Sequence, residues 1–172
     1  PHKRHGDEDA LVPTISCDYC FMGEKTETDR VYVKDEKGTT VPIIVHRNHR
    51  DRWIDTHAVP RKGRDTWAVK AVANDLTLAG FGEFIYKSDG EPAIKDLKAA
   101  AAEELRKAVG PTLRVTMEES GVGESQSNAH VERVIWEVEG MIRTLVFAAE
   151  HLHGMKTEID HPLRLWAIEY SG

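Results

Sequence analysis

Three carboxylates stand at positions where they could share one metal-binding site. Asp18 lies in the middle of the apolar stretch Thr14–Met22, Asp89 follows the stretch Glu83–Ser88, and Glu132 lies near the start of a helical pattern. Mg²⁺ prefers a few carboxylate ligands and keeps its other positions for water and phosphate oxygens. Two such ions about 4 Å apart can activate an attacking oxygen and stabilise the leaving one. The three residues therefore predict a site for two Mg²⁺ or Mn²⁺ ions that acts on a phosphodiester.

Asp18 is the most informative of the three because of its surroundings. The stretch T-I-S-C-D-Y-C-F-M is rich in aromatic and β-prone residues, which is typical of a central strand covered on both faces. An ionised Asp there costs several kcal/mol unless a cation or hydrogen-bond donors compensate it. Two simpler interpretations stay open. In the first, Asp18 is simply a charged residue at a strand end or a bulge. In the second, a chain with 29 acidic residues contains many sets of three that could be mistaken for a site.

Five strands are predicted from short apolar or alternating stretches. The first three are Thr14–Met22, Val41–His46 and Trp53–Val59, and short connections between the last two predict an antiparallel meander. The fourth and fifth are Glu83–Ser88 and Leu113–Met117. Residues 23–40 are charged and predict an exposed excursion with a short alternating piece over 31–33.

Four helices are predicted from periodic apolar residues with start and stop signals. The first begins at Asp65 or Thr66 and ends at Gly80, and the second begins at Pro92 and ends at Gly110. A polar loop over 118–128 precedes a long helix that is capped by Ser127 or Asn128 and ends at Gly154, and a last helix spans 163–170. The predicted fold class is α/β, a mixed five-stranded sheet flanked by helices. If the fourth strand pairs with the first, Asp18 and Asp89 open onto one end of this sheet.

Composition bounds the class of protein. The 172 residues are 40% hydrophobic and 30% charged, as in a globular domain with a real core. We expect a flexible lead-in over 1–12 and one domain over 13–172. The chain begins at Pro1, which predicts a processed product or an excised piece of a longer protein. No apolar run reaches the ~20 residues of a membrane span, and two cysteines favour a reducing compartment.

Basic residues predict where nucleic acid would bind. The net charge of −6 argues against a surface that grips nucleic acid everywhere, but six basic residues outnumber two acidic ones over 47–64. This region is predicted to be a phosphate-contacting face or, equally well, a solvated rim. The candidate nucleic-acid-binding residues are Arg61, Lys62, Arg64, Arg133 and Arg143.

Two further features have weaker interpretations. The string His2, His5, Cys17 and Cys20 has a zinc-like spacing, but two cysteines three apart in a strand face opposite sides and do not share a metal. Trp136 lies on the polar side of the long helix. We favour a protein interface for it over a platform on which bases stack.

The strings C-D-Y-C-F, S-D-G-E-P-A-I and Q-S-N-A-H-V-E-R resemble the three catalytic blocks of retroviral and LTR-retrotransposon integrases. The resemblance covers roughly residues 13–150 and implies a ribonuclease H-like fold with Asp18, Asp89 and Glu132 as the metal-binding triad. Two departures stand out. Asp89 and Glu132 are 43 positions apart, which is longer than usual in that family, and Trp136 and Glu139 occupy helix positions that are commonly basic.

The resemblance implies an enzyme, the catalytic core of an integrase. Such a core trims the 3′ ends of element DNA with water and joins the new 3′-hydroxyl to target DNA. It also implies DNA as a partner, a homodimer or higher oligomer, and a nuclear or cytoplasmic location or one inside a polyprotein-derived particle. Two alternatives stay open: a ribonuclease H-type nuclease with a fourth carboxylate at Asp65 or Asp75, and a decayed core kept as a dimerisation module.

Overall fold

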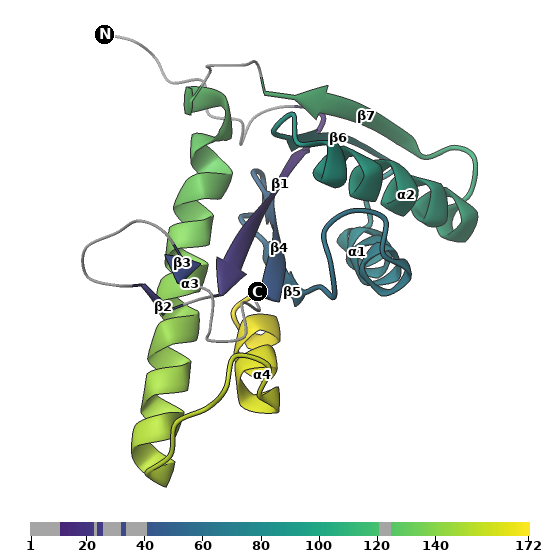
Figure 1. Ribbon diagram of the computed structural model, residues 1–172. Coiled ribbons are helices and arrows are strands. Elements are labelled where there is room, and N and C mark those ends of the chain that lie inside the picture. The colour runs from purple at the N-terminus through teal and green to yellow at the C-terminus, as the bar shows by residue number, and fades with distance from the viewer. Residues whose placement is uncertain (1–10, 23, 26–31, 34–40, 121–124) are drawn as a thin grey trace, which may run out of the picture.

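A five-stranded mixed sheet lies at the centre of the chain (Figure 1). The computed structural model describes residues 11–22, 24–25, 32–33, 41–120 and 125–172. Antiparallel pairing joins β4 to both β5 and β1, whereas β1, β6 and β7 run parallel. The strands, in their order across the sheet, are β5 (Ile54–Ala58), β4 (Val41–Asn48), β1 (Thr14–Met22), β6 (Glu83–Ser88) and β7 (Arg114–Glu119).

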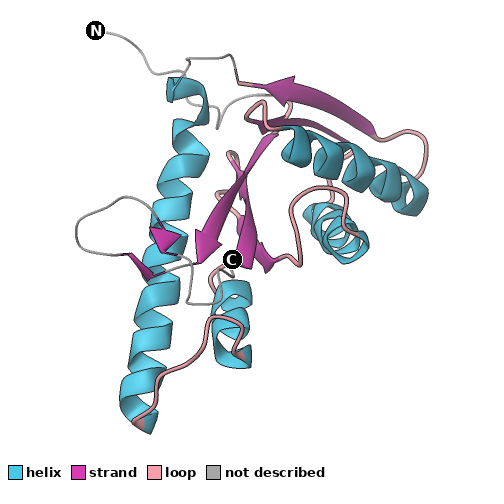
Figure 2. Cartoon of the chain, in the orientation of Figure 1, coloured by secondary structure: helices cyan, strands magenta, loops and turns pink. Residues whose placement is uncertain are grey.

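Helices cover both faces of the sheet (Figure 2). On one face α1 (Thr66–Ala79) and α2 (Pro92–Val109) bury their apolar sides, and on the other α3 (Ser125–His153) and α4 (Pro162–Tyr170) do the same. This arrangement confirms the predicted α/β class with a mixed five-stranded sheet. None of the helices in the described part of the chain is long and apolar enough to cross a membrane.

The central strand β1 contributes to both cores. Cys17 and Tyr19 pack in the core formed with α1 and α2, whereas Cys20 packs in the core formed with α3 and α4. Alternate residues of a strand point to opposite faces, so Asp18 belongs to the α3 side. The two cysteines are thus on opposite faces, as predicted. His2 and His5 lie outside the described residues.

The predicted helix ends of α1 and α2 are confirmed by their caps. Asp65 caps α1 by accepting hydrogen bonds from the backbone N–H groups of Trp67 at 2.9 Å and Ala68 at 3.2 Å. Gly80 ends this helix in a left-handed conformation, with φ of 72°, which a residue without a Cβ adopts at little cost. Pro92 opens α2, where its missing N–H has no helical partner to lose.

Some predicted bounds were wrong. β4 continues to Asn48, which pairs with Ile15, and β7 continues to Glu119, which pairs with Ser88. The pairing partners, rather than the polar side chains, decide where these strands end. The predicted loop over 118–128 is shorter, because α3 already begins at Ser125 and residues 121–124 lie outside the description. Glu132, predicted near the start of this helix, consequently lies about two turns into α3.

The predicted lead-in and excursion fall largely outside the described residues. Of the lead-in only Leu11 and Val12 are described, and of the excursion only two short strands. These strands, β2 (Glu24–Lys25) and β3 (Tyr32–Val33), pair antiparallel in a separate two-stranded sheet.

Candidate active site

Asp18 and Asp89 lie next to one another because of the register between β1 and β6. The paired residues Thr14–Ile85, Ile15–Tyr86 and Ser16–Lys87 all differ by 71 in number. The same difference separates Asp18 from Asp89, and each lies two residues beyond the last pair. In a parallel pair such residues point to the same face. The structure therefore brings these two predicted residues together.

Burial and neighbouring charge act on the Asp18 carboxyl. The pKa of Asp18 is raised to about 6, chiefly by burial and also by the charges of Asp89 and Glu91, while the Tyr19 N–H and Lys62 oppose the shift. Its Oδ1 accepts a hydrogen bond from that N–H at 2.7 Å. Negative charge at this position is thus unfavourable in the metal-free protein, although several groups partly compensate it.

A second carboxylate group borders Asp89. The Oδ1 of Asp89 accepts a hydrogen bond from the Glu91 N–H at 3.1 Å, which fixes the turn after β6. The carboxylate of Glu91 accepts from Lys62 Nζ, with both oxygens at 2.9 Å. Lys62 Nζ also lies 4.9 Å from the ring centre of Tyr19 and 4.8 Å from that of Phe21. Lys62 is thereby held beside Asp18 by an ion pair and by cation–π contacts.

Lys98 is a buried cation that the sequence analysis did not identify. Its side chain is 2% exposed, and Nζ donates to Ser88 Oγ at 3.0 Å and to the Glu118 carbonyl at 2.9 Å. These bonds join the ends of β6 and β7 directly before Asp89. Burial lowers the pKa of Lys98 despite nearby carboxylates. The sequence contained one indication that Lys98 is buried: it lies among the apolar residues of α2, between Ile94 and Ala101.

Glu132 lies on α3, the helix that packs on the same face of the sheet as Asp18. Its side chain is exposed, while the adjacent Val131 is buried. The possible ligand atoms of Asp18, Asp89 and Glu132 do not all lie within 4.8 Å of one another. Among the described residues, those of Asp55, His57 and Asp75 do. The structure thus pairs the two aspartates and leaves Glu132 on the helix that covers their face of the sheet.

Two histidines fix the part of α3 that carries Glu132. The ring of His130 lies 4.9 Å from the ring of His49, centre to centre. His49 Nε2 in turn lies 2.7 Å from Ser16 Oγ of β1. This chain of contacts ties the helix to the strand that holds Asp18, and sequence spacing gave no signal for it.

The predicted nucleic-acid-binding residues all have carboxylate partners. Lys62 pairs with Glu91, as described above. The other four ion pairs are Arg61–Asp65 at 3.6 Å, Arg64–Glu103 at 2.9 Å, Arg133–Glu137 at 3.4 Å and Arg143–Glu139 at 3.3 Å. Each arginine side chain is more than half exposed, so these pairs are weak and exchangeable.

The fourth carboxylates considered for a nuclease are occupied elsewhere. Asp65 caps α1 and Asp75 hydrogen-bonds His57 at 2.6 Å. Trp136 is 78% exposed, which agrees with its predicted place on the polar side of the helix.

No family model and no curated protein matches the chain. Among solved structures, a chain of the simian T-cell lymphotropic virus intasome in complex with PP2A regulatory subunit B56 gamma aligns with a TM-score of 0.52 and 15% identity, over 92% of this chain and 48% of that one. The HTLV-2 integrase catalytic core domain in complex with magnesium, in a trimeric form, aligns with a TM-score of 0.49 and 14% identity, over 94% of this chain and 84% of that one.

The sheet order, the flanking helices and the first alignment agree. The chain has the ribonuclease H-like fold of integrase catalytic cores, which supports the resemblance noted in the sequence. It spans about half the length of the intasome chain. At 15% identity the likeness establishes the fold, and activity has to be argued from the residues.

Proposed function

We propose that this chain is the catalytic core of a metal-dependent polynucleotidyl transferase that cleaves and joins DNA, as integrases do. The observation that carries the proposal is the register between β1 and β6, which sets Asp18, within β1, beside Asp89, directly after the end of β6. Substrates of α/β sheets bind outside such strand ends. The integrase-type fold then presents α3, with Glu132, to the same face of the sheet.

The residues present fit a divalent metal ion. Two adjacent carboxylates, one of them with a pKa raised to about 6 by burial and by its neighbours, are favourable ligands for a hard cation. Asp18 and Asp89 would hold Mg²⁺ or Mn²⁺, and Glu132 would complete the ligand set from α3. When bound, two such ions supply activation of an attacking oxygen and stabilisation of a leaving one.

The protein's own contribution is to position the DNA and these carboxylates. Lys98 holds the ends of β6 and β7 together, and Lys62 places a positive charge beside Asp18. In the proposed reactions water attacks the phosphodiester near a 3′ end in the first step, and the freed 3′-hydroxyl attacks target DNA in the second. Each attack forms one P–O bond and breaks another, so one site serves both.

The proposed partners are DNA and further copies of the chain. The simian virus relative is part of an intasome, and this chain spans about half of that relative. We therefore infer that the chain acts as one module of a larger nucleoprotein assembly in a reducing intracellular compartment. The five basic residues singled out above would contact phosphates after exchanging their carboxylate partners.

A disintegration assay tests the proposal and separates it from the two alternatives. The purified chain is incubated with a branched DNA intermediate and Mn²⁺, and with an RNA–DNA hybrid in parallel. Resolution of the branch into joined and released strands is expected, with loss of at least about a hundredfold in Asp18→Asn and Asp89→Asn. The exposed Asp96→Asn of α2 is the matched control and should keep full activity.

Other outcomes would favour the alternatives. Cleavage of the hybrid without strand joining would indicate a ribonuclease H-type enzyme. Absence of both activities in a folded wild type that self-associates would indicate a dimerisation module. Activity that survives in both Asn variants would show that Asp18 and Asp89 are not the site.

A further inference from the structure

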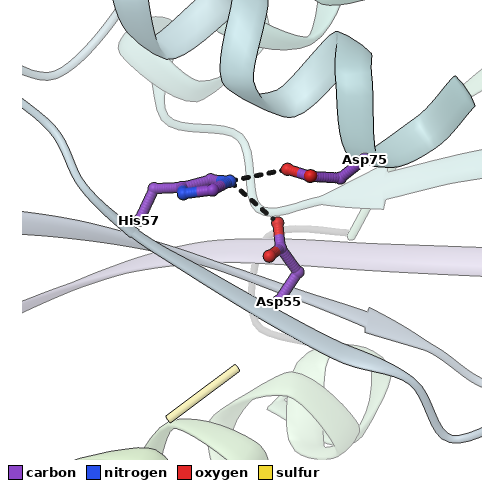
Figure 3. A group of neighbouring side chains, drawn as sticks. All are labelled: Asp55, His57 and Asp75. Atoms are coloured by element: carbon purple, nitrogen blue, oxygen red, sulfur yellow. Dashed lines mark hydrogen bonds and ion pairs between the residues drawn. The ribbon is translucent and has the colours of Figure 1, made fainter. Parts of the chain in front are cut away.

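A second group of metal-ligating side chains lies on the face of the sheet that α1 and α2 cover (Figure 3). Asp55 and His57 come from the edge strand β5, two residues apart and therefore on one face, and Asp75 comes from α1. His57 Nε2 lies 2.6 Å from Asp75 Oδ2 and 3.2 Å from Asp55 Oδ2. All three side chains are 12–16% exposed.

A fourth side chain, His46, points into this group from the neighbouring strand. His46 of β4 is paired directly with Asp55 in the antiparallel register. Its side chain is 1% exposed, and its Nδ1 lies 3.9 Å from Asp55 Oδ2. Both atoms are buried and have no hydrogen-bond partner. Buried polar atoms are nearly always satisfied, so two such atoms facing one another indicate a missing ligand between them.

Both histidines are oriented for ligation by the ring nitrogen that faces away from the group. His46 Nε2 lies 2.7 Å from the Tyr86 hydroxyl. His57 Nδ1 lies 2.8 Å from Glu169 Oε2, and Glu169 Oε1 accepts a hydrogen bond from the Ala58 N–H at 3.0 Å. A carboxylate or other partner on the distal nitrogen is the usual support of a metal-bound histidine. Glu169 and Tyr86 thus occupy supporting positions.

We propose that His46 Nδ1, Asp55, His57 Nε2 and Asp75 bind one transition-metal dication, preferably Zn²⁺. Two imidazole nitrogens and two carboxylate oxygens form a donor set that suits zinc and is too rich in nitrogen for Mg²⁺. Bonds of about 2.0–2.1 Å in a tetrahedron place donors about 3.3 Å apart. The distances of 3.2 Å and 3.9 Å bracket this value, and the 2.6 Å hydrogen bond has to open by less than about 1 Å.

The proposed ion differs in place and in role from the Mg²⁺ of the candidate active site. It lies on the opposite face of the sheet from Asp18, which belongs to the α3 side. Through its ligands the ion would join β4, β5 and α1, and through Glu169 it would also engage α4. Four ligands from the protein leave no open position, which is typical of a structural rather than a catalytic zinc.

The alternative is a metal-free ion-pair cluster. Burial opposes a charge on His57, but its contacts with Asp55, Asp75 and Glu169 raise its pKa to about 12, so a proton can take the place of the metal. In that arrangement Asp55 Oδ2 has an ion pair with His57 at 3.2 Å, but it and His46 Nδ1 stay without a hydrogen bond. Only direct measurement of bound metal separates the two states.

The test uses the full chain with its exposed histidines at 151 and 153, and those at 2 and 5, replaced by Gln to remove adventitious ligands. After treatment with EDTA and dialysis, zinc is added, unbound metal is removed by gel filtration, and bound zinc is counted by mass spectrometry. Co²⁺ is added to a second sample as a spectroscopic probe. We expect about one zinc per chain, and an intense visible absorption of tetrahedral cobalt that stoichiometric Zn²⁺ abolishes and millimolar Mg²⁺ does not.

Variants assign the ligands. Asp75→Asn keeps the shape of the side chain, and His46→Gln removes the buried nitrogen; each should weaken zinc binding at least about tenfold. Asp18→Asn and Asp89→Asn should leave it unchanged, so failure here is distinguishable from failure of the proposed function. Substoichiometric zinc, or octahedral cobalt in the wild type, would overturn the proposal even if a ligand variant did not fold. Equal zinc binding by Asp75→Asn would do the same.

Discussion

Asp18 carries an electrostatic cost that an exposed carboxylate does not. Burial is the largest cause of its raised pKa, and the proximity of Asp89 and Glu91 adds to it. A single pKa unit corresponds to about 1.4 kcal/mol of differential interaction. The residue is held in a position that is unfavourable for its charge unless a cation is present, which is the relation expected of a metal ligand.

The raised pKa predicts a pH-dependent effect of Asp18→Asn in the presence of EDTA. The folded-state pKa of about 6 exceeds the ordinary value of 3.8, so the folded protein binds the proton more tightly. The stability that the protonated group contributes is present below about pH 4 and is lost as the pH rises through 6. We expect the free energy of unfolding of Asp18→Asn to exceed that of the wild type by about 1–2 kcal/mol at pH 7.5, after allowance for partial solvent access. At pH 4.5 the difference should be much smaller.

Urea unfolding at the two pH values measures this difference. The exposed Asp96→Asn is the control, because neutralising such a residue changes the free energy of unfolding by only a few tenths of a kcal/mol. A difference between Asp18→Asn and the wild type that does not grow with pH would show that Asp18 is not electrostatically strained.

The same pair of aspartates predicts stabilisation by Mg²⁺. A ligand that binds only the folded state stabilises it by RT ln(1 + [L]/Kd), so 5 mM Mg²⁺ with a dissociation constant near 1 mM contributes about 1 kcal/mol. Asp18→Asn and Asp89→Asn should gain little, and Glu132→Gln should respond more like the wild type because Glu132 is exposed on α3. Thermal melts with and without Mg²⁺ test this. An equal shift in all four proteins would mean that the ion acts elsewhere.

Among the elements, α3 has two roles on different sides. One side buries Val131, Val134 and Val138 against the sheet, and the His49–His130 contact anchors it near Glu132. The opposite side exposes Trp136 by 78% and Phe147 by 71%. These two residues are eleven apart, which at about 100° per residue places them on nearly the same line along the helix. Large apolar side chains so exposed are typical of interaction surfaces.

We expect Trp136→Ala to weaken self-association of the chain. A buried tryptophan at an interface is worth about 2 kcal/mol, or roughly thirtyfold in the dissociation constant. Stability should change little because the side chain is exposed. Leu152 is 77% exposed and sixteen residues further along α3, nearly on the opposite side of the helix, so Leu152→Ala is a matched control. Sedimentation velocity over a concentration series provides the measurement. Loss of DNA binding with unchanged mass would instead support the base-stacking role.

At the scale of the whole molecule, charge limits the proposed DNA binding. The net charge is −6, and each of the five candidate DNA-binding residues is already paired with a carboxylate. Binding a phosphate therefore requires an ion pair to break or to be shared. Such a chain would bind DNA weakly by itself and would depend on other modules for affinity.

Removing two of these carboxylates should strengthen DNA binding. The double variant Glu103→Gln, Glu137→Gln frees Arg64 and Arg133. Two added phosphate contacts steepen the fall of log K with log salt by about 2, so the gain in affinity should be largest at low salt. Fluorescence anisotropy with a short duplex measures it. The control is the double variant Glu158→Gln, Asp160→Asn, which changes the net charge by the same amount at exposed positions before α4. An equal gain in DNA affinity in this control would indicate a non-specific charge effect.

The sequence by itself determined where most strands and helices lie. It also determined the local surroundings of two of the three candidate metal ligands, Asp18 and Asp89. Apolar periodicity located β1, β6 and the ends of α1 and α2, because strand alternation, helix caps, proline and glycine act over a few residues. It also indicated that Asp18 lies within a buried strand and that Asp89 follows another, and it carried the resemblance to integrases. The ends of β4 and β7 and the start of α3 were predicted wrongly, because pairing and packing with distant segments decide how far these elements extend.

Only the tertiary structure decided which side chains meet. The register that sets Asp18 beside Asp89 depends on hydrogen bonds between strands about seventy residues apart, and a one-residue slip would turn one of them to the other face. Contacts between distant segments likewise bring Lys98 to Ser88, and they gather His46, Asp55, His57 and Asp75 into one group. Local conformational preferences determine the secondary structure of residues that are near one another in sequence. Proximity across β4, β5 and α1 follows from the sheet register and helix packing, which no local pattern of residues specifies.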